Sequence, residues 1–134
     1  MENEQNQNNL RQELEFLESY VNSTEKQIQI MSRGLDEFSK AMAVLESEEI
    51  PHSSETMISL GGGLFMRGTL DKSKNILVAI GSDVYIEESS EKALERLKTQ
   101  ALDVQTGINT LNAQRSEAIS RYDSLVASLS KNRE

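Results

Sequence analysis

Three short stretches of the chain have residue types that could take part in chemistry. Glu87, Glu88 and Glu91 could form a paired-carboxylate acid–base site or bind a divalent cation. They end a predicted strand and begin a predicted helix, so we favour the interpretation that they place negative charge at a helix N-terminus. Residues 61–68 begin with three glycines, but they lack the Gly-Lys-Ser/Thr of a phosphate loop and lead into a predicted strand. A hairpin turn with positive φ angles is the favoured interpretation.

The third stretch contains the only histidine of the chain, His52. It stands beside Pro51 in a predicted loop, and no serine or aspartate has a spacing that indicates a catalytic triad, so a surface histidine is favoured. The chain has no cysteine, which excludes disulfides, thiolate nucleophiles and cysteine-ligated zinc. This inventory predicts no enzymatic activity, no cofactor and no metal site.

Composition narrows the remaining functions. The 134 residues include 14 Lys and Arg against 22 Asp and Glu, a net charge of −8, which is unfavourable for binding nucleic acid. No apolar run approaches the roughly 20 residues of a membrane span, and the polar start MENEQNQNN is unlike a signal peptide, so we expect a cytoplasmic protein with no membrane partner. Only 37% of the residues are hydrophobic. This predicts an elongated shape or a core completed by other chains.

Two long segments have apolar residues at alternating steps of four and three, the spacing of a heptad repeat. The positions in the first segment are Leu10, Leu14, Leu17, Val21, Thr24, Ile28, Met31, Leu35, Phe38, Met42 and Leu45. Those in the second are Leu94, Leu97, Ala101, Val104, Ile108, Leu111, Arg115, Ala118, Tyr122, Leu125 and Leu129. Thr24 and Arg115 are the only polar members. Each segment is predicted to form one long helix.

The matched lengths of the two segments predict that the helices pair antiparallel within the chain. The register that places Leu45 opposite Leu94 also places Thr24 opposite Arg115. A polar layer of this kind lowers stability but fixes the register, and the guanidinium of Arg115 could reach Glu25 or solvent. A tolerated arginine that extends to solvent is the alternative.

Two glycines fall at one level of this register. Gly34 and Gly107 both occupy g positions of the heptads. Each costs about 1 kcal/mol of helix propensity relative to alanine. The pair indicates either a bend or a close approach of the helices, or a coincidence.

Between the helices the apolar period changes to two. Pro51 is expected to end the first helix at Ile50, residues 52–55 to form a loop, and Ser89 or Ser90 to start the second helix. Four strands are predicted over residues 56–60, 64–70, 75–80 and 83–87, joined into hairpins by turn residues. The apolar residues that share one face of these strands are Ile58, Leu60, Leu64, Met66, Ile76, Val78, Ile80, Val84 and Ile86.

The predicted fold is therefore α+β, a long antiparallel two-helix coiled coil with two β-hairpins between the helices. The boundaries are 1–50 for the first helix, 51–88 for the hairpins and 89–134 for the second helix, all in one structural unit. Four short strands do not bury their apolar face alone. We expect the nine residues of that face to assemble with other chains into a closed barrel.

Apolar residues also gather near the chain ends, where we expect the helix pair to fray into the polar N-terminal stretch. These residues are Leu10, Leu14, Phe16, Leu17, Ile119, Tyr122, Leu125, Val126 and Leu129. A frayed tip with spare apolar surface could hold exposed hydrophobic segments of other proteins. Simple coiled-coil packing is the alternative.

The linker between the helices resembles the alpha-type subunits of the archaeal prefoldin family. Residues 58–68, ISLGGGLFMRG, are similar to the family's first hairpin, and residues 78–87, VAIGSDVYIE, to its second. Ser59 stands where a proline is common in the family, and Asp83 where a glycine is common. Two hairpins rather than one favour the alpha type over the beta type.

This resemblance implies a chaperone subunit in a hexamer of two alpha-type and four beta-type subunits. The hairpin residues named above would build a double barrel. The tips of the coiled coils would bind non-native polypeptides without ATP and pass them to a group II chaperonin. A coiled-coil scaffold that holds specific partners is the alternative function.

Overall fold

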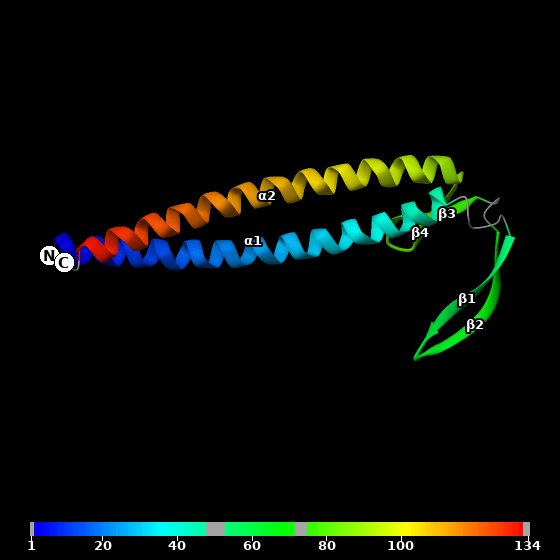
Figure 1. Cartoon of the computed structure of the whole chain (residues 1–134), viewed down its shortest axis with the longest axis horizontal. Helices are drawn as coiled ribbons and strands as arrows, with labels where there is room; N and C mark the ends of the chain where they lie inside the picture. The colour runs from blue at the N-terminus through cyan, green and yellow to red at the C-terminus, as the bar shows by residue number, and fades with distance from the viewer. Residues whose placement is uncertain (1, 48–52, 72–74, 133–134) are drawn as a thin grey trace. The chain divides into compact units, whose positions relative to one another are not determined.

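The computed structural model describes residues 2–47, 53–71 and 75–132 and has the predicted order of elements (Figure 1). The elements are α1 (Glu2–Glu46), β1 (Ser53–Gly61), β2 (Leu64–Asp71), β3 (Ile76–Gly81), β4 (Val84–Glu88) and α2 (Ser90–Asn132). The chain divides into two compact units. The paired-helix unit contains Met1–Asp36 and Asp103–Glu134, and the hairpin unit contains Glu37–Leu102.

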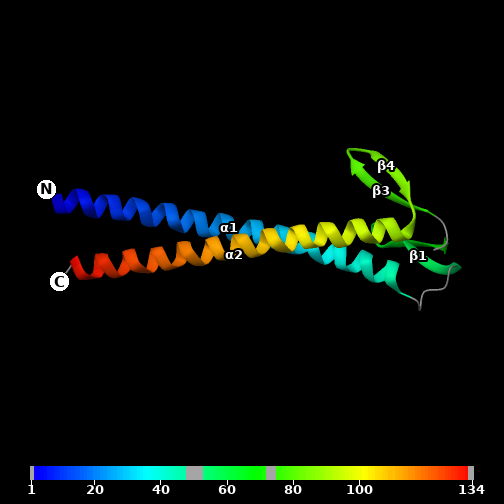
Figure 2. The same cartoon turned by 90° about the horizontal axis from the view of Figure 1, so that it is seen from above.

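In the paired-helix unit, α1 and α2 run antiparallel, and the start of α1 lies beside the end of α2 (Figure 2). Every predicted heptad position of both helices is buried or half-buried, whereas most of the positions between them are exposed. The most buried side chains of this unit are Thr24, Ile108, Ala118 and Leu125. The seam predicted from the heptads is therefore confirmed.

Ion pairs between the helices confirm the predicted register. Arg115 Nη2 lies 2.9 Å from Glu25 Oε1, the contact expected for the arginine of the polar layer. Closer to the chain ends, Arg121 Nε of α2 donates to Glu13 Oε1 of α1 at 3.1 Å. Thr24 is only 3% exposed, and its hydroxyl donates to the carbonyl oxygen four residues earlier at 2.8 Å. The polar layer thus leaves neither side chain without a partner.

The two glycines of the seam differ in their surroundings. A Cβ atom at Gly107 would lie 2.6 Å from the Met31 Cε methyl, whereas a Cβ at Gly34 would meet no atom within 4 Å. Of the alternatives left open for this pair, a close approach occurs at Gly107, where the absence of a side chain admits the methionine. Gly34 has open space around it and makes no such approach.

The helix ends differ from the predictions at the N-terminus. The helix α1 begins at Glu2 and includes the polar stretch that was expected to fray. Four of residues 2–9 are asparagines, which are poor helix formers, but Glu and Gln are good ones, and the carboxylates of Glu2 and Glu4 lie in the first turn, where negative charge is favourable. The helix itself therefore does not fray here, and separation of the two helices at this end stays a prediction. At its other end α1 stops at Glu46 and Ser47 is not helical, so the predicted helix over residues 1–50 is too long. The predicted stop at Pro51, and the loop histidine His52, lie outside the described residues.

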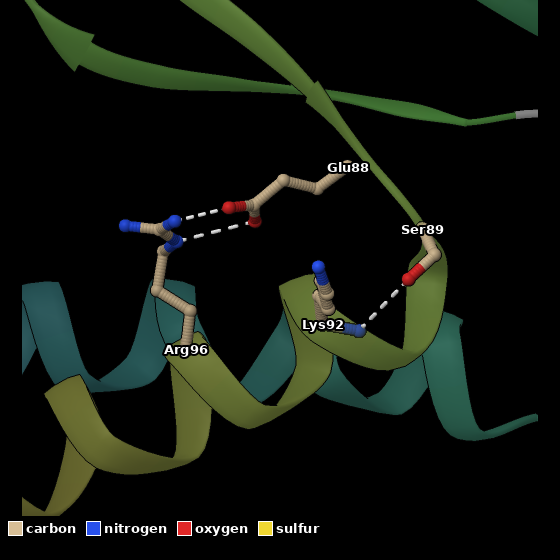
Figure 3. Close-up of polar contacts among 4 residues, drawn as sticks. All are labelled: Glu88, Ser89, Lys92 and Arg96. Atoms are coloured by element: carbon tan, nitrogen blue, oxygen red, sulfur yellow. Dashed lines mark hydrogen bonds and ion pairs between the residues drawn. The ribbon is translucent and has the colours of Figure 1, made fainter.

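The helix α2 starts as predicted. Its first residue is Ser90, and Ser89 is the N-cap, with its Oγ accepting a hydrogen bond from the Lys92 backbone N–H at 3.3 Å (Figure 3). A serine N-cap of this kind stabilises a helix by about 1 kcal/mol relative to alanine.

The first hairpin is longer than the sequence indicates. In β1, Ser54 lies opposite Leu70 and Glu55 opposite Thr69, so the expectation of a loop up to residue 55 is wrong. The polar residues of this segment favour a loop locally, but β2 extends to Asp71 and offers backbone partners along its whole length. Pairing with the partner strand therefore overrides the local preference.

Both hairpin turns need left-handed backbone, as predicted for the glycines. Gly61, Gly62 and Gly63 have φ angles of 91°, 60° and 80°, which glycine adopts without a steric penalty. Asp83 has a φ of 59° in the second turn, and aspartate tolerates this region better than most residues. In the first turn Ser59 Oγ accepts the Gly61 N–H at 3.4 Å. Both departures from the family pattern thus fit their turns.

Cross-strand pairing confirms the predicted faces. Ile58 lies opposite Met66 in the first hairpin, and Val78 lies opposite Ile86 in the second. Because paired residues point to the same side of a ladder, the predicted apolar residues share one face of each hairpin.

Candidate functional site

The first hairpin exposes its predicted assembly face. Ile58, Leu60, Leu64 and Met66 are 49–66% exposed in the single chain. Ile58 also lies across Gly68, where a Cβ atom would come within 2.5 Å of its Cδ1. The face is therefore an apolar surface that the described residues of the chain leave largely uncovered.

The second hairpin has a partly covered face. Ile76, Val78 and Ile86 are half-buried, whereas Ile80 and Val84, beside the turn, are exposed. Ile76 and Val78 line an open cleft of about 450 Å³ within the hairpin unit. Its other walls come from both helices and include Ala41, Val44, Leu45, Ala93 and Leu97. On this face of the second hairpin, only Ile80 and Val84 at the turn end are as exposed as the residues of the first hairpin.

The opposite faces of the hairpins also carry exposed apolar side chains. Met57 and Phe65 belong to the first hairpin, and Leu77 and Tyr85 to the second. In the first hairpin these residues lie next to an exposed ion pair, with Arg67 Nη1 4.0 Å from Glu55 Oε1. The two faces of this hairpin thus differ in charge, although both expose hydrophobic side chains.

A charged clamp connects the end of β4 to α2. The Arg96 guanidinium binds both carboxylate oxygens of Glu88, with Nε 3.2 Å from Oε2 and Nη2 on Oε1 (Figure 3). This hydrogen bonding, together with the positive charge of Arg96, lowers the pKa of Glu88 below its ordinary value of 4.5. The same contact raises the pKa of Arg96. A two-point contact of this kind orients the strand relative to the first turns of the helix.

The three glutamates at the junction of β4 and α2 have separate roles. Glu88 binds an arginine, Glu91 lies in the first turn of α2, and Glu87 is exposed on the outer face of β4. Within residues 2–47, 53–71 and 75–132, no group of three or more His, Cys, Asp or Glu side chains could hold a metal ion. Arg96 was not predicted, and its spacing from Glu88 follows no helical or strand repeat that would have revealed it.

The predicted tip residues fall into three classes of exposure. Phe16 is 68% exposed and Val126 is 40% exposed, whereas Leu125 is only 4% exposed. The half-buried members are Leu10, Leu14, Leu17, Ile119, Tyr122 and Leu129. The structure therefore brings seven of the nine into or against the seam and leaves two on the outside.

A shallow groove of about 320 Å³ lies on the Phe16 side of the seam. We call it the aromatic groove, and its lining includes Phe16, Leu17 and Tyr20 from α1 and Gln114, Glu117, Ala118 and Arg121 from α2. The Phe16 and Tyr20 rings stack with centroids 6.4 Å apart and planes 22° apart. Tyr20 was not among the predicted residues, although aromatic residues four apart on a helix are expected to meet.

A second groove of about 260 Å³ lies beside the same seam. It is lined by Glu18, Val21 and Asn22 from α1 and by Ile119 and Tyr122 from α2. Ile119 and Tyr122 therefore retain accessible surface in this groove although they are half-buried.

Comparison with known families decides the identity. The family model for the prefoldin subunit matches residues 4–133, nearly the whole chain. The chain belongs to the prefoldin family. Prefoldin subunits act in chaperone complexes and are not enzymes, so family membership confirms the prediction of a non-enzymatic chaperone protein.

Individual relatives support the alpha type. The prefoldin subunit alpha of Thermoplasma acidophilum is 30% identical over 115 residues, which cover 86% of this chain and 88% of the relative. That of Thermoplasma volcanium is 37% identical over 86 residues, covering 64% of this chain and 66% of the relative. These matches confirm the alpha-type prediction made from the two hairpins.

Among solved structures, the prefoldin fold is matched by the cryo-EM structure of filamentous PFD from Methanocaldococcus jannaschii. The TM-score is 0.72 at 14% identity, and the match covers 87% of this chain and 97% of that chain. This confirms the predicted fold of two long helices with two hairpins between them. No helix in the described part of the prefoldin chain has the length and hydropathy of a membrane span.

Proposed function

We propose that this prefoldin subunit assembles with four beta-type subunits and a second alpha-type copy into a hexamer in the cytoplasm. The hexamer holds non-native polypeptides without ATP at the free ends of its coiled coils. It then passes them to a group II chaperonin. The hairpins supply the assembly surface, and the paired-helix units supply the client-binding surface.

The observation that carries this proposal is the uncovered apolar face of the first hairpin. Burying a fully exposed large apolar side chain contributes about 1.5–3 kcal/mol, and the four side chains of that face are roughly half exposed, so covering them represents about 3–6 kcal/mol before ordering costs. An isolated two-stranded hairpin is marginally stable at best in water. Closure with the hairpins of other subunits supports assembly, because it covers the face and removes the strand edges.

Client binding is supported by the exposed side chains near the chain ends. Phe16 and Val126 present apolar surface on the outside of the helix pair. Each contact is weak on its own because binding also orders the client. Several arms acting on one unfolded chain raise the effective affinity through avidity.

The test uses the complex assembled with beta-type subunits and an unrelated aggregating client, without nucleotide. Deleting residues 1–17 and 122–134 is expected to abolish protection and to leave the oligomer intact, with the number of subunits unchanged. A gentler variant, F16S with V126S, is expected to weaken protection. The matched control is I30S, which also replaces an exposed apolar residue of α1, 67% exposed, outside both grooves.

Two outcomes would contradict the proposal. Equal protection by the truncated complex would show that the helix ends do not bind clients. A wild-type complex that binds one partner and suppresses no aggregation would favour the scaffold alternative. Transfer is tested separately, by following a labelled client from the complex to a group II chaperonin in gel filtration.

A further inference from the structure

The stacked rings of Phe16 and Tyr20 form an apolar platform in the aromatic groove. The Phe16 ring is largely exposed and stacks on Tyr20, and the Tyr20 hydroxyl donates to Gln114 Oε1 at 3.4 Å on the opposite helix. The platform is therefore held by both helices and does not depend on one mobile ring. A flat exposed ring of this kind stacks well on aromatic side chains and on guanidinium groups.

The charges around the groove are unbalanced. Arg121 lines the groove, but its guanidinium is paired with Glu13 across the helices at 3.1 Å. Glu117 also lines the groove and has no ion-pair partner within the described parts of the chain. With the Arg121 charge neutralised by Glu13, one negative charge remains beside the apolar platform.

The second groove repeats this combination on its own side of the seam. Tyr122 and Ile119 supply apolar surface, and the carboxylate of Glu18 stands at the same groove. Glu18 likewise has no ion-pair partner in the described segments. Each side of the helix pair thus presents an aromatic side chain next to an unpaired carboxylate.

We propose that the aromatic groove selects client segments in which an aromatic side chain stands next to an arginine or lysine. The client ring packs on Phe16 and Tyr20, and the client cation lies near Glu117. This inference rests on the proposed client-binding function and adds a chemical preference to it. An apolar segment followed by an acidic residue binds more weakly, because the client carboxylate meets Glu117 at short range.

The test measures binding of short unstructured peptides to the complex assembled with beta-type subunits, by fluorescence anisotropy at low salt. Three peptides share one sequence except at the residue after a phenylalanine, which is Arg, Gln or Glu. We expect the Arg peptide to bind about two- to five-fold more tightly than the Gln peptide, the range for an exposed ion pair. High salt is expected to remove this preference.

Substitutions in the aromatic groove test which residues cause the preference for the Arg peptide. In a Glu18→Gln background, which removes the carboxylate of the second groove, Glu117→Gln is expected to reduce affinity for the Arg peptide to that for the Gln peptide. Phe16→Ala is expected to weaken all three peptides about five-fold or more. The matched controls are Asp103→Asn, which removes one negative charge from the same unit, and Ile30→Ala, which removes exposed apolar surface outside the grooves. Neither control is expected to change the order of the peptides.

Equal binding of the Arg and Glu peptides, or a preference that survives Glu117→Gln in the Glu18→Gln background, would overturn the inference. Protection of an aggregating client by the same wild-type complex distinguishes failure of the holdase function from failure of the chemical preference. If protection is retained while the peptides bind equally, the holdase function stands and the chemical preference is wrong. If protection is absent, the proposed function itself is wrong.

Discussion

The two seam glycines allow the packing of the helix pair to be tested quantitatively. Replacing a helical glycine with alanine stabilises a helix by about 1 kcal/mol when the new methyl group meets no other atom. Gly34→Ala satisfies this condition, because nothing lies within 4 Å of the added Cβ. We therefore expect Gly34→Ala to raise the free energy of unfolding by about 1 kcal/mol.

Gly107→Ala has the same helix propensity gain but an added steric cost. Its new Cβ would lie 2.6 Å from the Met31 Cε methyl, so the methionine must leave its position. Moving a flexible side chain off its preferred rotamer costs about 0.5–1.5 kcal/mol. The gain and the cost nearly cancel, so we expect a change between about +0.5 and −0.5 kcal/mol.

A double-mutant cycle with Met31→Ala isolates the steric part. In that background Gly107→Ala is expected to recover the full gain of about 1 kcal/mol, because the opposing methyl is gone. The assay is urea unfolding of the assembled complex at fixed concentration, followed by helix circular dichroism. If Gly107→Ala stabilises wild type as much as Gly34→Ala does, Met31 does not pack into the space at Gly107 and the reasoning is refuted.

Three further predictions concern the clamp and the polar layer. Because the pKa of Glu88 is lowered in the folded state, the Arg96 clamp stabilises the fold fully above pH 4.5, and this stabilisation is lost as the pH falls through the lowered pKa. Glu88→Gln is expected to remove this acid dependence from unfolding midpoints measured between pH 3 and 6. An unchanged pH profile in the variant would contradict the prediction. Cysteines at Thr24 and Arg115 are expected to crosslink within one chain under mild oxidation, whereas cysteines at Thr24 and Ile108 are not; equal yields would refute the register. Arg115→Leu is expected to stabilise the helix pair and to permit other registers, which hydrogen exchange would detect as weaker protection of the seam amides. A less stable helix pair with a single register would show instead that the ion pair between Arg115 and Glu25 outweighs the burial of leucine.

The helix pair was predictable because its information is local and repeated. Each heptad position is confirmed by burial, and a shift of register would have misplaced every layer at once. Arg115 is informative in this respect. As the only polar residue in its series, it indicated a partner at one level of the other helix, and the structure places Glu25 there.

The hairpins were predictable in number and face but not in length. Alternation of apolar residues and the turn glycines identify both hairpins, since these signals lie within a few residues. The start of β1 at Ser53 depends instead on how far β2 extends on the other side of the turn. The polar residues at that end contain no local signal for a strand.

The amino-acid sequence by itself determined the helices, their antiparallel register, the two hairpins and the family to which they belong. These features follow from periodicity and turn chemistry, which act over a few residues and repeat along the chain. Only the tertiary structure decided that Arg96 binds Glu88, that Met31 occupies the space at Gly107, and that Tyr20 reaches Gln114. Contacts of this kind depend on side-chain directions at positions with no fixed spacing, and the last of them joins residues 94 positions apart.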